Sequence, residues 1–148
     1  MLTYRMAAAA DGEWLYSLKR ATLRTFVEAT WGPWDDNDQR GRFAASFRPA
    51  ETEIIQQDGQ PVGVLRVREE DKCVYLADLA VWPDRQHQGI GREAITAVLT
   101  RAMGRGKPVR LQVLKVNPAR ELYARLGFAI IGDTATHFVM EHPAPAAS

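Results

Sequence analysis

The sequence has little of several features that mark particular classes of protein. Its 148 residues include a single cysteine, Cys73, so no disulfide can form within the chain, and a reducing compartment is the simplest expectation. No apolar run approaches the roughly 18 residues that span a bilayer. The N-terminal segment has only a short alanine run where a signal peptide needs a longer apolar core. We therefore expect a cytoplasmic protein that makes no contact with a membrane.

The sequence also lacks an excess of charge of one sign. It has 19 basic and 18 acidic residues, a net charge of +1, so no basic surface for nucleic acid is expected. Its length, with 46% hydrophobic and 25% charged residues, is typical of one compact globular domain. We expect a single domain over residues 1–142 and a disordered Pro/Ala-rich tail over residues 143–148.

Hydrophobic periodicity and turn residues predict alternating strands and helices. Asp11 is expected to cap the first helix and Asp36 or Asn37 the second, and Asp58-Gly59 predicts a hairpin turn. Expected strands are 2–6, 52–57, 61–68, 72–81, 109–116, 128–132 and 136–141. Expected helices are 12 to about 30, about 37–47, 89–103 and 118–127. This order predicts a mixed α/β (α+β) fold with helices on the faces of its sheet. Cys73, in an expected strand, is interpreted as a small buried side chain.

The segment from Gln86 to Gly91 lies between an expected strand and an expected helix. Gly89 and Gly91 lack Cβ atoms, so the backbone can turn tightly and approach a bulky anion. The first N–H groups of a helix have no internal partner, and the helix dipole is positive there. A diphosphate would fit this turn, with Arg85 and Arg92 adding charged contacts. An ordinary glycine turn that opens a helix is the competing interpretation.

A nicotinamide dinucleotide is a second possible ligand, because Gly89-Ile90-Gly91-Arg92-Glu93-Ala94 fits the G-x-G-x-x-A pattern. That pattern needs the glycines directly after the strand and an acidic residue about 20 positions later. Seven residues separate Val81 from Gly89, and the later strand contains no acid. The sequence therefore disfavours this cofactor.

Two motifs are typical of one enzyme family. Gln86-His-Gln-Gly89-Ile-Gly91 matches every defined position of the Q/R-x-x-G-x-G/A hallmark of GNAT-type N-acetyltransferases. Asn117, Tyr123 and Gly127-Phe128 are similar to the second motif of that family, so residues 74–132 resemble it closely. The resemblance implies a GNAT fold with a mixed, mostly antiparallel sheet of six to seven strands and about four helices on its two faces.

The resemblance also implies acetyl-CoA as co-substrate and no metal ion. In the family, backbone groups of the strand before the glycine turn pair with pantetheine, and the amides of the turn hold the pyrophosphate. The implied cofactor-binding residues are Leu79, Ala80, Val81, Gln86, His87, Gln88, Gly89, Ile90, Gly91, Arg92, Asn117 and Arg120. The commonest family spacing places the asparagine seven residues before the tyrosine, whereas here six separate them. Asn117 is therefore equally well interpreted as a helix cap.

Tyr123 matches the position of the family's general acid, which protonates the leaving thiolate; helix packing is the alternative. The glutamate that some members use as a base is absent, since the corresponding strand has Leu111 and Gln112. Asp78 is the best candidate for the base, although its carboxylate could instead point to solvent or to a backbone donor. Glu28 is a weaker candidate.

In this family the first helix-loop-helix shapes the acceptor site. Indole rings attract cations, so Trp31, Trp34, Asp35 and Glu28 are expected to favour a positively charged amine, although tryptophans also pack cores and aspartates also cap helices. We expect direct transfer of acetyl to a primary amine, on a small molecule or a peptide terminus, through a tetrahedral intermediate. A non-catalytic acyl-CoA-binding sensor is the alternative, and a homodimer is an open expectation.

Overall fold

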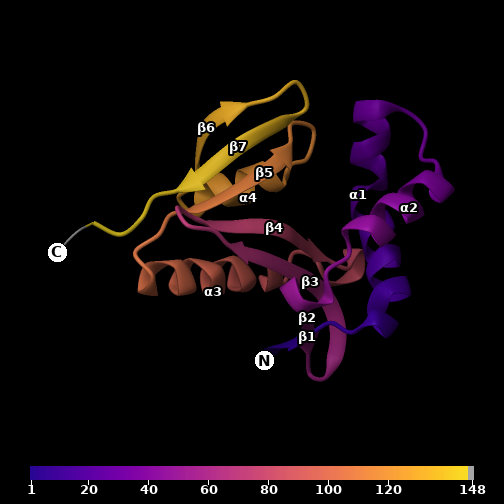
Figure 1. Cartoon of the computed structure of the whole chain (residues 1–148), viewed down its shortest axis with the longest axis horizontal. Helices are drawn as coiled ribbons and strands as arrows, with labels where there is room; N and C mark the ends of the chain where they lie inside the picture. Colours follow the sequence, from indigo (N-terminus) through magenta and orange to yellow (C-terminus); the bar gives the residue numbers. More distant parts are fainter. Residues whose placement is uncertain (147–148) are drawn as a thin grey trace. The chain divides into compact units, whose positions relative to one another are not determined.

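A computed structural model describes residues 1–146 and has seven strands and four α-helices (Figure 1). The strands are β1 (Leu2–Met6), β2 (Thr52–Gln57), β3 (Gln60–Glu69), β4 (Val74–Val81), β5 (Val109–Leu114), β6 (Ala129–Asp133) and β7 (His137–His142). The helices are α1 (Gly12–Trp31), α2 (Asp36–Ser46), α3 (Ile90–Gly104) and α4 (Ala119–Arg125), with short 3-10 turns at Ala9–Asp11, Pro49–Glu51 and Pro83–Arg85. These elements confirm the predicted mixed fold.

The strands form one sheet in the order β1-β2-β3-β4-β5-β7-β6. Strands β4 and β5 pair in parallel, whereas β1–β2, β2–β3, β5–β7 and β6–β7 pair antiparallel. A parallel pair needs a crossover connection, which here contains α3. The contacts of the chain group into two compact units: residues 1–66 with 78–91, and residues 67–77 with the chain from 92 onward.

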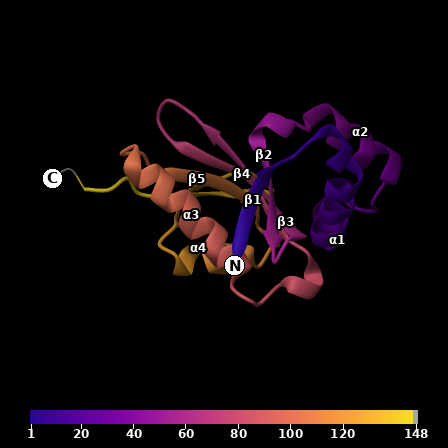
Figure 2. The same cartoon turned by 90° about the horizontal axis from the view of Figure 1, so that it is seen from below.

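In the first unit, β1 lies beside β2 (Figure 2), and β2 continues into β3 through the predicted two-residue hairpin. Asp58 and Gly59 have φ angles of 53° and 81°, the positive pair that a type I′ turn requires. Helix α1 buries Leu15, Tyr16 and Leu18. The N-terminal end of α1 and helix α2 pack around a small core formed by Ala7, Leu15 and Ile54. The partly buried apolar side chains packed against this core are Trp14, Phe43, Phe47 and Val64.

The cap of α2 differs from the one predicted, whereas Asp11 occupies the predicted cap position of α1. Asp35, one residue before the predicted caps, closes α2, because its carboxylate accepts a hydrogen bond from the N–H of Asp38 at 3.1 Å. Asp36 instead accepts hydrogen bonds from the hydroxyl of Tyr16 at 2.6 Å and Nε of Arg40 at 2.8 Å. It thereby links α2 to α1.

At the start of α1, Asp11 occupies the cap position, but its side chain makes no capping bond to the helix. Its carboxylate accepts from the guanidinium of Arg5 at 2.9 and 3.0 Å and from the N–H of Ala8 at 2.7 Å. Asp11 therefore ties the first strand to the turn before the helix.

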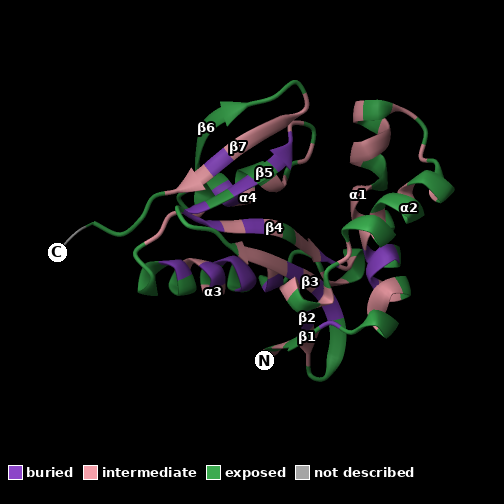
Figure 3. Cartoon of the chain, viewed as in Figure 1, coloured by how far each residue is buried: buried purple, intermediate pink, exposed green. Residues whose placement is uncertain are grey.

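Helix α3, which belongs to the second unit from Arg92 onward, is buried along one side and exposed along the other (Figure 3). The buried residues are Ile90, Ala94, Ile95, Val98 and Ala102, at the spacing of one helix face. Strand β5 alternates in the manner of a half-buried strand: its buried positions begin at Val109, and Arg110 and Gln112 are exposed. Cys73 lies just before β4 and is only 5% exposed, as predicted, and burial raises the pKa of its thiol.

Residues 143–146 form no helix or strand. The predicted tail also includes residues 147–148, which lie outside the described part of the chain. The predictions of a single domain and of a disordered tail stay predictions.

Gly63 in β3 allows β3 and β4 to approach closely, because a Cβ atom there would lie 2.5 Å from the carbonyl oxygen of Ala80. Gly63→Ala is expected to lower the free energy of unfolding by about 1–3 kcal/mol, the usual cost of overpacking. The matched control is Gly41→Ala in α2, where a Cβ meets nothing within 4 Å and alanine is expected to stabilise by about 0.5–1 kcal/mol. Denaturant unfolding measures both variants. Equal stabilities would contradict the close approach.

The hydrogen bond from Tyr16 is the main cause that lowers the pKa of Asp36 from its ordinary 3.8 to about 2, with Arg40 second. Because the folded-state pKa is lowered, this carboxylate stabilises the protein above pH 3.8 and loses that effect as the pH falls toward 2. In Tyr16→Phe the pKa of Asp36 should rise and this acid-side dependence should weaken. Carboxyl carbon NMR and acid unfolding test this. An unchanged Asp36 pKa would assign the effect to Arg40 and Trp34.

Candidate functional site

The predicted anion-binding turn follows the end of β4. Val81 is buried, and the N–H of Trp82 donates to the carbonyl of Val62 at 2.8 Å. The chain then forms the turn Pro83–Arg85. The side-chain amide of Gln86 donates a hydrogen bond back to the carbonyl of Val81 at 3.0 Å. This bond closes the loop over the strand end and fixes where the glycine turn begins.

Two residues in this turn adopt left-handed backbone conformations. Gln86 has φ −72° and ψ 162°, and His87 follows at φ 65°, the signs of a type II turn. Gly89 has φ 83°, and a Cβ atom on it would meet nothing within 4 Å. Residues 86–89 are exposed, whereas Ile90, the first residue of α3, is 3% exposed. The buried Ile90 anchors the N-terminus of a 15-residue helix directly behind an open, sharply turned backbone.

The two arginines expected to assist a phosphate differ in their surroundings. The guanidinium of Arg85 donates to the side-chain oxygen of Gln57 at 3.0 Å. Arg92 is exposed and, with Leu122, Arg125 and Leu126, lines a hollow of about 350 Å³ in the second unit. Arg125 was not among the residues predicted to bind the cofactor; its position on the helix of the second motif, three residues after Leu122, was the available signal.

The apolar residues around Asp78 in the sequence suggested a buried side chain, but the side chain of Asp78 is more exposed than that. Half of its side chain is accessible, and one carboxylate oxygen lies 3.5 Å from the guanidinium of Arg66. Arg66, only 16% exposed, also pairs with Glu51 at 3.3 Å. The charge of Asp78 also acts on the half-buried ammonium of Lys19 in α1. Asp78 therefore has solvent and two cations around it, and its role as a base stays a prediction.

The predicted acceptor residues are engaged largely with each other and with the frame of α1 and α2. Glu28 accepts from the N–H of Trp34 at 3.1 Å and pairs with Arg24 at 3.5 Å. The indole N–H of Trp34 donates to Asp36 at 3.4 Å. Asp35 caps α2, and Trp31 is 60% exposed. These contacts give each carboxylate a structural partner, and contact with an amine stays a prediction.

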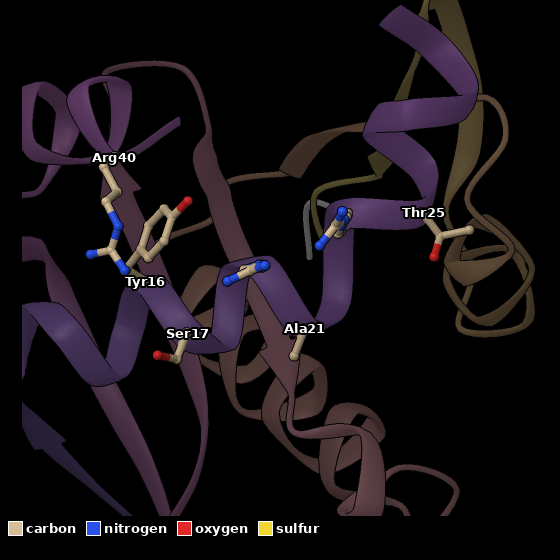
Figure 4. A pocket seen from close by; sticks show the side chains of 7 residues that line it. Tyr16, Ser17, Ala21, Thr25 and Arg40 are labelled. Atoms are coloured by element: carbon tan, nitrogen blue, oxygen red, sulfur yellow. The ribbon is translucent and has the colours of Figure 1, made fainter. Parts of the chain in front are cut away.

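A hollow of about 430 Å³ lies along α1, and Figure 4 shows Arg40 beside Tyr16 at one end and Thr25 at the other. Its lining residues are Tyr16, Ser17, Arg20, Ala21, Arg24, Thr25 and Arg40. The small side chains of Ser17, Ala21 and Thr25, four residues apart, leave space beside Arg20 and Arg24 on the same side of the helix. None of the predicted acceptor residues lines it. This hollow was not predicted; its signal in the sequence was the four-residue spacing of Ser17, Ala21 and Thr25.

The second unit holds the residues of the second motif. Pro118, and not the predicted Asn117, occupies the cap position of α4. The side-chain oxygen of Asn117 still accepts a hydrogen bond from the N–H of Ala119 at 2.9 Å, at the start of that helix. Tyr123 is 8% exposed and packs edge-to-face on Phe128 with ring centroids 5.7 Å apart. The guanidinium of Arg120 lies 5.7 Å from the ring centre of Phe138. Gly127 ends α4 at φ 99°, and its Cβ would approach His142 to 3.1 Å.

Within residues 1–146, no helix is both long and apolar enough to cross a membrane. The same residues contain no cluster of three histidine, cysteine, aspartate or glutamate side chains placed to hold a metal ion.

Comparisons with known proteins agree with this fold. Among solved structures, the chain is similar to PaiA N-acetyltransferase from Thermoplasma acidophilum in complex with coenzyme A, with a TM-score of 0.77, 16% identity and coverage of 97% of this chain and 99% of that one. It is also similar to the ribosomal-protein-S18-alanine N-acetyltransferase from Escherichia coli, with a TM-score of 0.72, 22% identity and coverage of 100% and 97%.

A third similar structure is Arabidopsis thaliana Naa50 in complex with the bisubstrate analogue CoA-Ac-MVNAL, with a TM-score of 0.65, 18% identity and coverage of 95% of this chain and 97% of that one. At these identities the likeness establishes the fold. No curated protein matches the sequence. A model of the acetyltransferase (GNAT) family matches residues 15–128. Since this match covers most of the chain, the protein belongs to the GNAT family of acetyltransferases.

Proposed function

We propose that the protein is an acetyl-CoA-dependent N-acetyltransferase that transfers the acetyl group directly to a primary amine. The exposed turn from Gln86 to Gly89 at the N-terminus of α3 carries this proposal. Left-handed conformations at His87 and Gly89 turn the backbone sharply, and a helix N-terminus adds positive potential. Together they make a cradle suited to a diphosphate, in a chain of the GNAT family.

The residues present fit this co-substrate in two further respects. The space around Gly89 is open, so a bulky anion can approach the backbone. Arg92 and Arg125 border a hollow with two leucines, a setting suited to a nucleotide that carries phosphates. By family resemblance, the backbone of Leu79, Ala80 and Val81 would pair with the pantetheine arm. The amides of residues 86–92 would then hold the diphosphate.

Acetyl-CoA supplies an activated thioester carbonyl. An alkyl ammonium has a pKa near 10.4 and must lose a proton before it can attack, and we assign this proton to the carboxylate of Asp78 or to water. A main-chain N–H near Ala80 or Val81 would stabilise the developing oxyanion. The new C–N bond replaces the C–S bond, and the hydroxyl of Tyr123 would give its proton to the departing sulfur.

The class of acceptor is inferred from the neighbours. One is an alanine N-acetyltransferase of a ribosomal protein, and another binds an analogue that joins CoA to a short peptide. These neighbours support the amine of a peptide or protein as the acceptor, and small amines form the comparison set.

Release of CoA thiol in the presence of acetyl-CoA and a panel of peptides and small amines tests this proposal. Turnover with at least one amine is expected. Tyr123→Phe should then reduce kcat by about a hundredfold, the lower range for general acid–base catalysis, with acetyl-CoA affinity by calorimetry unchanged. Tight acetyl-CoA binding without turnover for any amine would instead favour the non-catalytic sensor.

Gly89→Ala should weaken acetyl-CoA binding by about tenfold, because an L-residue in the left-handed region costs about 1–2 kcal/mol and its methyl group occupies the cradle. Gly104→Ala is the matched control: this glycine ends the same helix, and its Cβ meets nothing within 4 Å. Calorimetric titration compares the two variants. Equal affinities would show that the turn does not hold the diphosphate.

A further inference from the structure

The hollow along α1 contains positive charge that the protein only partly compensates. Arg20 and Arg24 both line it and lie four residues apart, so they share one side of the helix. Nε of Arg24 lies 3.5 Å from the carboxylate of Glu28. Arg20 makes no ion pair or hydrogen bond within residues 1–146. Like charges at this spacing destabilise a helix, and an anion bound between them would relieve that repulsion.

The hydroxyl groups of the hollow are also available to a ligand. A threonine inside a helix commonly donates a hydrogen bond to the carbonyl four residues before it, and the four other threonines of α1 and α3 do so at 2.8–3.0 Å. In the described part of the chain, the hydroxyls of Thr25 and Ser17 make no such bond. Both line the hollow (Figure 4), and each therefore offers a donor there.

Two acidic side chains lie at one end of the hollow, where Arg40 engages both. The guanidinium of Arg40 lies 4.4 Å from the ring centre of Tyr16. It donates to Asp36 at 2.8 Å and to Glu13 at 3.1 Å, and the hydroxyl of Tyr16 also donates to Asp36. Arg40 is thus a neutralised end wall. The uncompensated positive charge lies further along the hollow, at Arg20.

We propose that this hollow binds a small anion with two phosphate or carboxylate groups, independently of acetyl transfer. Its volume of about 430 Å³ is typical of small-molecule sites. Guanidinium groups bind both kinds of oxyanion through paired N–H donors. The donors from Ser17 to Thr25 extend over about 12 Å of helix axis. A single phosphate or carboxylate does not span this length, which is why we assign two groups to the ligand.

NMR titrations of the full-length protein at constant ionic strength test this inference, with pyrophosphate as the phosphate probe and citrate as the carboxylate probe. At least one probe should shift the backbone amide signals of Ser17, Ala21 and Thr25 in a saturable manner, and the tighter binder identifies the preferred oxyanion. Sodium chloride at the same ionic strength should give no saturable shift. If neither probe produces one at these amides, the inference is overturned.

Pyrophosphate also suits the turn from Gln86 to Gly89, so each site is followed through its own amide signals. Gly89→Ala should weaken the response of that turn and leave the response of α1 unchanged. If the α1 response is lost with it, the shifts in α1 only report binding at the turn, and the inference fails.

Arg20→Gln should weaken binding of the anion about tenfold, the effect of losing one charge-assisted contact. Arg42→Gln is the matched control, because it removes the same charge from α2. Arg42 does not line the hollow, and its guanidinium pairs with Asp38 at 2.9 Å. Equal weakening by the two variants would overturn the inference, since the anion would then respond only to net charge.

A second matched pair tests the hydroxyl donors. Thr25→Val should weaken binding about threefold, as expected for one neutral hydrogen bond. Thr22→Val should leave binding unchanged, because the hydroxyl of Thr22 is engaged with the carbonyl of Leu18 at 2.8 Å. Equal affinities for the two valine variants would contradict a donor role for Thr25.

Thermal unfolding without the anion shows whether Arg20 serves the fold instead. Arg20→Gln should unfold at the same temperature as the unmodified protein or at a higher one, because it removes the repulsion between Arg20 and Arg24. A lower unfolding temperature would contradict an uncompensated charge at this position and overturn the inference.

Discussion

The close packing of β3 against the end of β4 is the constraint on which the functional region of the first unit depends. Gly63 has no side chain where the carbonyl of Ala80 approaches it, and the N–H of Trp82 makes a final bond to Val62. The strand ends there, and the bond from Gln86 to Val81 returns the chain over that end. The position of the glycine turn, and of the helix N-terminus behind it, follows from this junction.

The local elements could be predicted because their signals are local. The hydrophobic periodicity predicted the strand and helix ranges to within a few residues. Asp58-Gly59 predicted its hairpin because few other residue pairs can both adopt the positive φ angles that the turn requires. The glycine turn was predicted because Gly89 and Gly91 lack Cβ atoms; Gly89 is left-handed at φ 83°, whereas Gly91 lies within α3. The left-handed conformation of His87 in this turn was not predicted, because His87 carries a side chain and the conformation is uncommon outside glycine.

The partners of the charged side chains could not be predicted, because distant residues decide them. Three aspartates lie near the start of α2, and any of them can cap a helix; the hydroxyl of Tyr16, twenty positions earlier, engages Asp36 and leaves the cap to Asp35. Asp78 similarly acquires its environment from Arg66 on the neighbouring strand and from Lys19 on α1. Such pairings depend on tertiary packing, and the sequence alone offers several that are equally reasonable.

The single cysteine has a practical consequence. Cys73 is 5% exposed, and burial raises the pKa of its thiol. Thiolates, not thiols, react with disulfide and maleimide reagents. In the folded protein this side chain is therefore nearly silent toward such reagents, so a thiol-sensitive dye added to a native sample reports CoA with little background. The same dye should respond to the protein itself only on unfolding, which provides a built-in check that a sample has stayed folded during measurement.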